Sequence, residues 1–332
     1  MKTNDMSFNF IRAVCALGII VFHFSCHISD TLYRPLFVTQ NFAWENCLVS
    51  TFFLLSGLLI YRNNRTVPSL GKFYIKRVKS IFPSFYLAFF YCFIVNAITS
   101  HSLFYIGSPK YLVLSVFGMD GYFSYRFPSY YILGEWFLGA IILLYLLYPI
   151  VVKGFNRLPV LILAIVTGLY IFGICFTGFK ISDEHNLFTC LFCFVLGMVI
   201  EKYELYKKTV LLIPSILIFV ILTFLKIPVS IVICGNVAGI CLLFILYNIG
   251  KIIMKSKCIS LIFNEIGRIS YQIFLLQHLI IVFVLNNIPP ADNIAMVCKL
   301  ALTIVLIIAA AEVLNIVTKA VTDKLFTKRK PA

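Results

Sequence analysis

Two residues able to do acid–base and anion-binding chemistry, Arg12 and His23, lie inside the first apolar run of the chain, FNFIRAVCALGIIVFHFSCH (residues 8–27). They are eleven positions apart, which at 100° per residue is three turns plus about 20°, so both side chains lie on one face of a helix. They are about 16 Å apart along its axis, because each residue rises about 1.5 Å. A guanidinium binds phosphates, and a neutral imidazole can accept a proton from a hydroxyl near neutral pH. The spacing therefore predicts a helix face with an anion-binding group at one end and a general base at the other.

Each of these residues also has a simpler interpretation. Arg12 could snorkel from a helix end to the membrane surface, with its aliphatic stem in the apolar region. His23 could form a hydrogen bond that only holds two helices together. Polar groups inside a membrane usually face the helix-bundle interior or a wet cavity, and a shared face for both residues favours the chemical interpretation.

The elements that position these residues follow from composition. The chain has 332 residues, of which 61% are hydrophobic and 12% charged, and its mean hydropathy is +0.98. Soluble globular proteins do not have this composition, so we expect an all-α polytopic membrane protein. The first run lacks a small-residue cleavage site after His23, and we interpret it as a retained helix rather than a signal peptide.

Apolar runs of membrane-spanning length predict about ten transmembrane helices. With the N-terminus inside, all 28 Lys and Arg fall on the inner side except Arg34, Lys110, Arg126, Lys180, Lys226 and Lys299. This asymmetry predicts that both termini are cytoplasmic. It also accounts for the net charge of +15 without nucleic acid. The predicted spans are 8–27, 43–61, 81–99, 130–152, 159–179, 187–200, 209–227, 229–249, 269–286 and 294–318.

No soluble domain interrupts these runs, so the sequence predicts a single transmembrane domain over residues 1–332. Two connections are longer than linking requires: a basic cytoplasmic loop (62–80) and an aromatic-rich outer loop (100–129) that could cover a site. A short basic cytoplasmic tail follows at 319–332. The eleven cysteines are scattered through the apolar runs without metal-ligand spacing, so we expect no metal.

Five segments together resemble the acyltransferase 3 family of integral membrane O-acyltransferases. IRAVCALGIIVFH matches the family's first helix, with a basic residue, ten intervening residues and a histidine. The others are STFFLLSGLLIYR (50–62), FYIKRVKSIFPSFY (73–86), WFLGAIILLYLLYP (136–149) and ISYQIFLLQHLII (269–281). The chain departs from the family pattern at Ser80, where an arginine is usual, and at Gln277, where the late histidine is usual and His278 follows instead. We expect a member of the type without the esterase-like domain that is fused in part of the family.

The resemblance implies transfer of an acyl group, most often acetyl, from cytoplasmic acyl-CoA to a hydroxyl of a carbohydrate or lipid-linked sugar. In the scheme that the residues suggest, basic side chains around 62–80 bind the coenzyme A phosphates, above all Lys72, Lys76, Arg77 and Lys79, but also Arg62 and Arg65. Arg12 holds the donor, and His23 acts as general base, with a covalent acyl-histidine as the competing mechanism. The expected orienting groups are Glu135 and Trp136. Tyr130, Tyr131 and His278 are the expected substrate-binding residues.

These predictions place the protein in the plasma membrane of a bacterium, in contact with membrane lipids and a glycan acceptor. Assembly into a homo-oligomer stays open. The alternative function is a polytopic transporter or sugar-lipid flippase that uses Arg12 and His23 to bind its substrate. Against it, no pair of Gly- or Pro-broken helices recurs in corresponding halves of the sequence.

Overall fold

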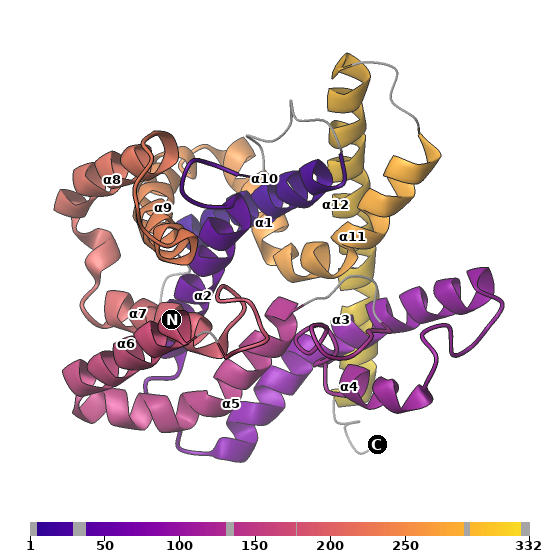
Figure 1. Cartoon of the computed structure of the whole chain (residues 1–332), viewed down its shortest axis with the longest axis horizontal. Coiled ribbons are helices and arrows are strands. Elements are labelled where there is room, and N and C mark those ends of the chain that lie inside the picture. Colours follow the sequence, from indigo (N-terminus) through magenta and orange to yellow (C-terminus); the bar gives the residue numbers. More distant parts are fainter. Residues whose placement is uncertain (1–4, 29–37, 131–135, 177, 289–292, 327–332) are drawn as a thin grey trace. The chain divides into compact units, whose positions relative to one another are not determined.

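A computed structural model of the protein describes residues 5–28, 38–130, 136–176, 178–288 and 293–326, and over these residues the chain is helical, without strands (Figure 1). The α-helices are α1 (Met6–Cys26), α2 (Trp44–Asn63), α3 (Leu70–Thr99), α4 (Leu112–Val116), α5 (Trp136–Arg157), α6 (Pro159–Cys175), α7 (Leu187–Lys202), α8 (Leu212–Phe224), α9 (Ile231–Ile253), α10 (Lys257–Arg268), α11 (Ser270–Asn287) and α12 (Asn293–Phe326). The described residues also form the 3₁₀ turns η2 (Pro109–Tyr111), η3 (Leu205–Lys207) and η4 (Thr209–Leu211).

Each of the ten predicted spans overlaps one α-helix of the described chain, and an all-α polytopic membrane fold is confirmed. Among the described residues, seven helices are long and apolar enough to cross a membrane: α1, α2, α3, α5, α9, α11 and α12. Two shorter apolar helices cover Pro159–Cys175 and Thr209–Phe224. The outer loop contains the short helix α4.

The expected basic loop at 62–80 is mostly helical, which corrects the sequence-based boundary. α2 continues to Asn63, and α3 begins at Leu70, where the Ser69 side chain caps the helix by accepting a hydrogen bond from the Lys72 main chain. Helical structure continues beyond the apolar run because a capped polar turn is stable in water as well as in lipid. The basic residues from Lys72 to Lys79 therefore lie on a regular helix.

The chain divides into two compact units. Unit 1 comprises residues 1–67 and 143–270, and it holds α1, α2, α6 to α10 and the second half of α5. Unit 2 comprises residues 68–142 and 271–332, and it holds α3, α4, the start of α5, α11 and α12.

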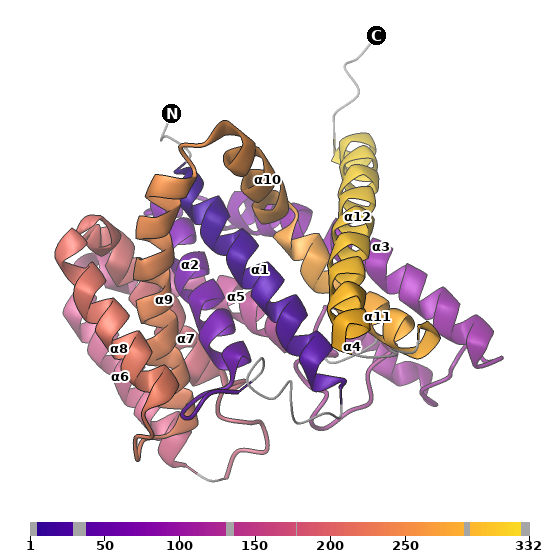
Figure 2. The ribbon, with the colours of Figure 1, turned by 90° about the horizontal axis from the view of Figure 1, so that it is seen from above.

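In unit 1, α1 packs against α2, α9 and α10, and α2 also packs against α7 (Figure 2). The α2–α7 crossing is close, because a β-carbon at Gly57 would collide with the main chain of Phe194 and one at Gly197 would collide with the main chain of Leu54. Small residues at such crossings are the usual means of packing membrane helices tightly. This contact fixes α2, and therefore the groups that α2 presents to α1.

In unit 2, α3 packs against α12, and hydrogen bonds between side chains join α3, α11 and α12. The Ser84 hydroxyl lies 3.1 Å from the Thr318 hydroxyl and accepts a hydrogen bond of 3.1 Å from the Gln272 amide. The Tyr271 hydroxyl donates to the main-chain carbonyl of Ile81. We call Ser84, Thr318 and Gln272 the polar seam of unit 2.

Candidate functional site

The first helix carries Arg12 and His23 in an uninterrupted α-helix, so the register inferred from their spacing is confirmed. The Asp5 side chain caps this helix by accepting from the Ser7 main chain, and its other carboxylate oxygen accepts a bond of 2.9 Å from the Tyr247 hydroxyl of α9. These two contacts hold the start of α1 in place. Arg12 and His23 are half-buried.

Arg12 has no ion-pair partner among the described residues. The titratable side chain that faces it is Tyr145 of α5, which is a phenol and not a carboxylate. A guanidinium in the body of a membrane helix is costly when its charge is not compensated. The position therefore suits a negatively charged or strongly polar ligand.

His23 lies at the other end of α1 in a group of titratable side chains. Its charged or ionisable neighbours are Glu45 and His27. Glu45 lies in the first turn of α2, and its Oε1 is 3.8 Å from Nε2 of His185, which precedes α7. The structure thus places the Glu45 carboxylate near the His23 imidazole, and His185 contacts the same carboxylate.

Glu45 is a further candidate for the orienting role that the sequence analysis gave to Glu135, a prediction that the structure does not test. Glu135 lies outside the described residues, and Trp136 is the first residue of α5, in unit 2. Glu45 and His185 are 140 positions apart, so no local pattern in the sequence links them. The sequence gives only a weaker indication that Glu45 and His185 meet, which is that both lie at predicted outer ends of apolar runs.

A second polar cluster, on Arg62, changes the interpretation of one predicted phosphate ligand. The Arg62 Nε and Nη2 atoms donate to the Glu201 Oε2 atom at 3.0 and 2.7 Å, and Nη2 also donates to the Tyr206 hydroxyl at 2.6 Å. The guanidinium also lies 4.5 Å from the centre of the Phe8 ring. Burial raises the pKa of Tyr206 to about 12, so its hydroxyl stays neutral.

This cluster, which we call the Arg62 clasp, joins α1, α2, α7 and η3. Arg65 reaches the other Glu201 oxygen at 3.5 Å from a more exposed position. Glu201 already neutralises Arg62 in this structure, which favours a structural role for the pair. The expectation that Arg62 binds a coenzyme A phosphate stays a prediction.

The four basic residues of the predicted donor site lie together on the first turns of α3. Lys72 and Lys76 are exposed, and Arg77 and Lys79 are half-buried. The Arg77 guanidinium lies 5.8 Å from the centre of the Phe73 ring. Neither Lys72 nor Lys76 forms an ion pair within the described part of the chain. Exposed lysines without counter-ions fit a polyanionic ligand.

Tyr130, expected to bind substrate, is an internal residue. Its ring is 1% exposed and packs edge-on against Tyr105 with centroids 5.2 Å apart. The Tyr105 hydroxyl donates to the Tyr130 main-chain carbonyl at 2.6 Å, and burial raises the pKa of Tyr105. Tyr130 cannot present an open face for stacking on a sugar, but it lines a cavity of about 240 Å³ with Asn96, Tyr105 and Ser129. Tyr131 lies outside the described residues.

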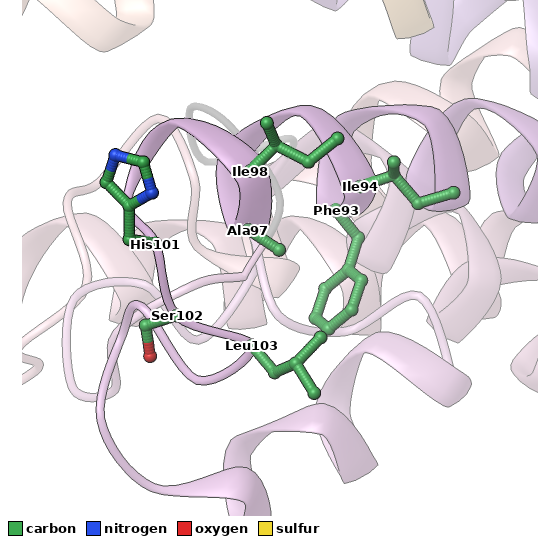
Figure 3. A pocket seen from close by; sticks show the side chains of 7 residues that line it. All are labelled: Phe93, Ile94, Ala97, Ile98, His101, Ser102 and Leu103. Carbon is green, nitrogen blue, oxygen red and sulfur yellow. The ribbon is translucent and has the colours of Figure 1, made fainter.

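A larger hollow of about 320 Å³ lies at the end of α3 but carries little chemistry. Its lining includes Phe93, Ile98 and Leu103, and Figure 3 shows Phe93 and Leu103 pointing toward one another while the His101 ring turns away. Such an apolar hollow fits lipid contact better than catalysis. His278, the last predicted substrate ligand, lies on α11 in unit 2.

Within the residues that the structure describes, no group of His, Cys, Asp and Glu could hold a metal ion. The side chains of Glu45, His23 and His185 are of the types that take part in proton transfer and hydrogen bonding. The arrangement on α1 combines an uncompensated cation with a histidine backed by a carboxylate.

The acyltransferase 3 family model, described as an acyltransferase domain, matches residues 6–312. No curated protein and no solved structure matches the chain.

Proposed function

The chain belongs to the acyltransferase 3 family and is a multi-pass membrane acyltransferase, and from that premise we propose that it is an O-acetyltransferase of the bacterial plasma membrane. It moves an acetyl group from cytoplasmic acetyl-CoA to a hydroxyl of a surface polysaccharide or lipid-linked sugar. The observation that carries the proposal is the α1 face, where Arg12 has no acid partner in the described chain and His23 lies beside Glu45. A purely structural helix has no need of this combination.

The donor is bound through its negative charge. The phosphates of acetyl-CoA are attracted by Lys72, Lys76, Arg77 and Lys79, with Lys72 and Lys76 exposed on the start of α3. Arg12 then binds a phosphate or an amide carbonyl of the donor. Both contacts favour the polyanionic donor over other thioesters.

The transfer step is an acyl substitution at the thioester carbonyl. The acceptor hydroxyl oxygen attacks the carbonyl carbon while a neutral His23 ring nitrogen takes the hydroxyl proton. The carbon–sulfur bond then breaks, and the coenzyme A thiolate leaves and takes up a proton, from the imidazolium or from water. The products are an acetyl ester and coenzyme A thiol, and His23 is neutral again after the proton has gone.

Glu45 is a positioning residue in this scheme. Its carboxylate favours the imidazolium that forms when His23 accepts the proton, and it can hold the ring in one orientation. His185, 3.8 Å from the same carboxylate, restrains Glu45. General acid–base catalysis of this kind contributes about 10²- to 10⁴-fold to the rate.

The acceptor approaches from the outer side in the predicted orientation. Asn96, Tyr105 and Ser129 contribute polar atoms to the cavity of about 240 Å³ at the outer loop of unit 2. Hydroxyl and amide groups of this kind bind sugar hydroxyls. A lipid-linked acceptor would reach the protein from the surrounding membrane.

The test follows label from acetyl-CoA into extractable glycolipid or polysaccharide in membranes that contain equal amounts of folded wild type or His23→Ala. We expect transfer to fall about 10²- to 10⁴-fold in the variant while acetyl-CoA still binds. His101→Ala is the matched control, because it removes a histidine at the far end of α3. If wild type binds acetyl-CoA but transfers no label, or moves an intact sugar-lipid across the bilayer instead, the acyltransfer proposal fails.

A further inference from the structure

Gln277 of α11 is a buried amide without a hydrogen-bond partner. Its side chain is 1% exposed, and both the Nε2 and the Oε1 atoms lack a partner within the described residues. A carboxamide has two donor hydrogens and an acceptor oxygen, so this residue leaves its whole hydrogen-bonding capacity unused. Buried amides are nearly always paired, and leaving one unpaired costs free energy.

The neighbouring polar groups of unit 2 do not satisfy it. The hydrogen bonds of the polar seam join its own members, because Gln272 donates to Ser84 and Ser84 pairs with Thr318. On α12, Asn315 donates to Glu312 at 3.3 Å. Within the described residues of this unit other buried atoms also lack partners, among them the Gln272 carbonyl oxygen and the Thr322 hydroxyl. Gln277 is therefore not part of the network that joins these helices.

The position of Gln277 along α11 indicates which ligand could reach it. Gln277 lies seven residues after Ser270, the first residue of α11, which is about 10 Å along the helix axis. The preceding helix, α10, ends at the charged residue Arg268. In the predicted orientation this end of α11 is cytoplasmic. Gln277 therefore lies in the inner part of the membrane, on the side from which acetyl-CoA enters.

We propose that Gln277 binds an amide of the pantetheine arm of the acyl donor. The carboxamide can donate to the amide carbonyl and accept from the amide N–H of the arm, which satisfies both atoms that are unpaired in the protein alone. The acceptor sugar, which enters from the opposite side, is a less suitable ligand at this depth. The inference rests on the proposed function, since it assumes that acyl-CoA is the donor.

The experiment compares wild type with Gln277→Met, which keeps the length of the side chain and removes the amide. Binding is measured with coenzyme A, with pantetheine, which retains both amides but lacks the nucleotide, and with a simple alkyl thiol that has no amide. Turnover is measured with the three acetyl thioesters. We expect the Kd for coenzyme A and for pantetheine, and the matching KM values, to rise about 5- to 150-fold, as expected when one buried partner of a hydrogen bond is lost. The amide-free thiol and its thioester should show no change.

Thermal stability provides the second readout. Because Gln277 is unpaired in the ligand-free protein, Gln277→Met should unfold at the same temperature as wild type or a higher one. Ser84→Ala is the matched control: it breaks the polar seam, so it should lower the unfolding temperature and leave the preference among the donors unchanged.

An equal effect on the amide-free thioester, a change in KM for the acceptor alone, or no change with any donor would overturn the assignment. The last result would mean that an ordered water holds Gln277. These outcomes all require a wild type that binds acetyl-CoA and transfers acetyl, so failure of the proposed function is seen first and separately.

Discussion

Replacing Glu201 by alanine tests whether Arg62 belongs to a structural clasp or to the donor site. In wild type, Arg62 donates twice to Glu201 and once to Tyr206, and its side chain is 13% exposed while that of Glu201 is 3% exposed. Glu201→Ala leaves the guanidinium in this place without its carboxylate. The perturbation therefore removes a counter-ion and not only a contact.

The expected loss follows from the burial of the pair. Breaking a buried ion pair by removing one partner costs about 3–5 kcal/mol, because the remaining charge is uncompensated. Arg65 provides an internal comparison, since its side chain is 53% exposed and 3.5 Å from the same carboxylate. Exposed pairs contribute about 0–1 kcal/mol, so Arg65→Met should have little effect. The double variant Arg62→Met, Glu201→Leu should recover most of the stability lost in Glu201→Ala, because it buries no charge.

The assay is reversible unfolding in mixed micelles by titration with a denaturing detergent, with acetyl-CoA binding measured on the same preparations. We expect Glu201→Ala to reduce the free energy of unfolding by about 3–5 kcal/mol. Among the folded molecules, acetyl-CoA binding should be unchanged. If Glu201→Ala is as stable as wild type, or if the double variant folds well but loses acetyl-CoA binding, the clasp is not structural and Arg62 is a donor ligand.

Three further predictions concern other contacts. Glu45→Gln should lower the kcat of acetyl transfer about 10- to 1,000-fold with little change in the KM for the donor. Glu45→Asp should retain part of the wild-type kcat, because it keeps the carboxylate. If Glu45 is purely structural, the substitutions should change the stability and not kcat. Gly197→Leu should destabilise unit 1 by about 3 kcal/mol or more in the detergent titration, because the new side chain would collide with the main chain of Leu54. Gly168→Leu is the control and should be neutral or stabilising, because a β-carbon at Gly168 would contact no other atom. The raised pKa of Tyr206 contributes stability that is present below pH 10 and is lost as the pH rises through about 12, so Tyr206→Phe should remove this alkaline loss when unfolding is followed from pH 9 to 12.

The helical fold could be predicted from the sequence wherever an apolar run determined the element. A run of membrane-spanning length leaves the backbone few alternatives to a helix, and the predicted spans all correspond to helices. The same criterion missed the start of α3 and the whole of α10. In both segments polar residues alternate with apolar ones, as in Lys257–Arg268, where Ile266 is buried and Leu261 is exposed. Hydropathy averaged over a window does not detect such a helix.

The candidate site could be predicted only where both partners lie on one helix. The relation between Arg12 and His23 follows from the period of α1, and it holds. The contacts of Glu45 with His185, and of Arg62 with Glu201, join residues about 140 positions apart, and depend on how α2 packs against α7. That packing depends on glycines whose partners are main-chain atoms, so nothing in the local sequence identifies the carboxylate that meets each cation.

The cationic side chains of unit 1 differ in whether a carboxylate of the described chain neutralises them. Arg62 and Arg65 share Glu201, and His185 lies on Glu45. The fold therefore has the means to neutralise a cation where it needs only stability. Arg12, in the body of α1, has no such carboxylate in the described chain, and the same helix fixes it three turns from His23. An uncompensated guanidinium can hold an anionic or polar donor, and a histidine beside a carboxylate can remove a proton. Because α1 fixes the distance between these two groups, we propose that the reaction takes place on this face of α1.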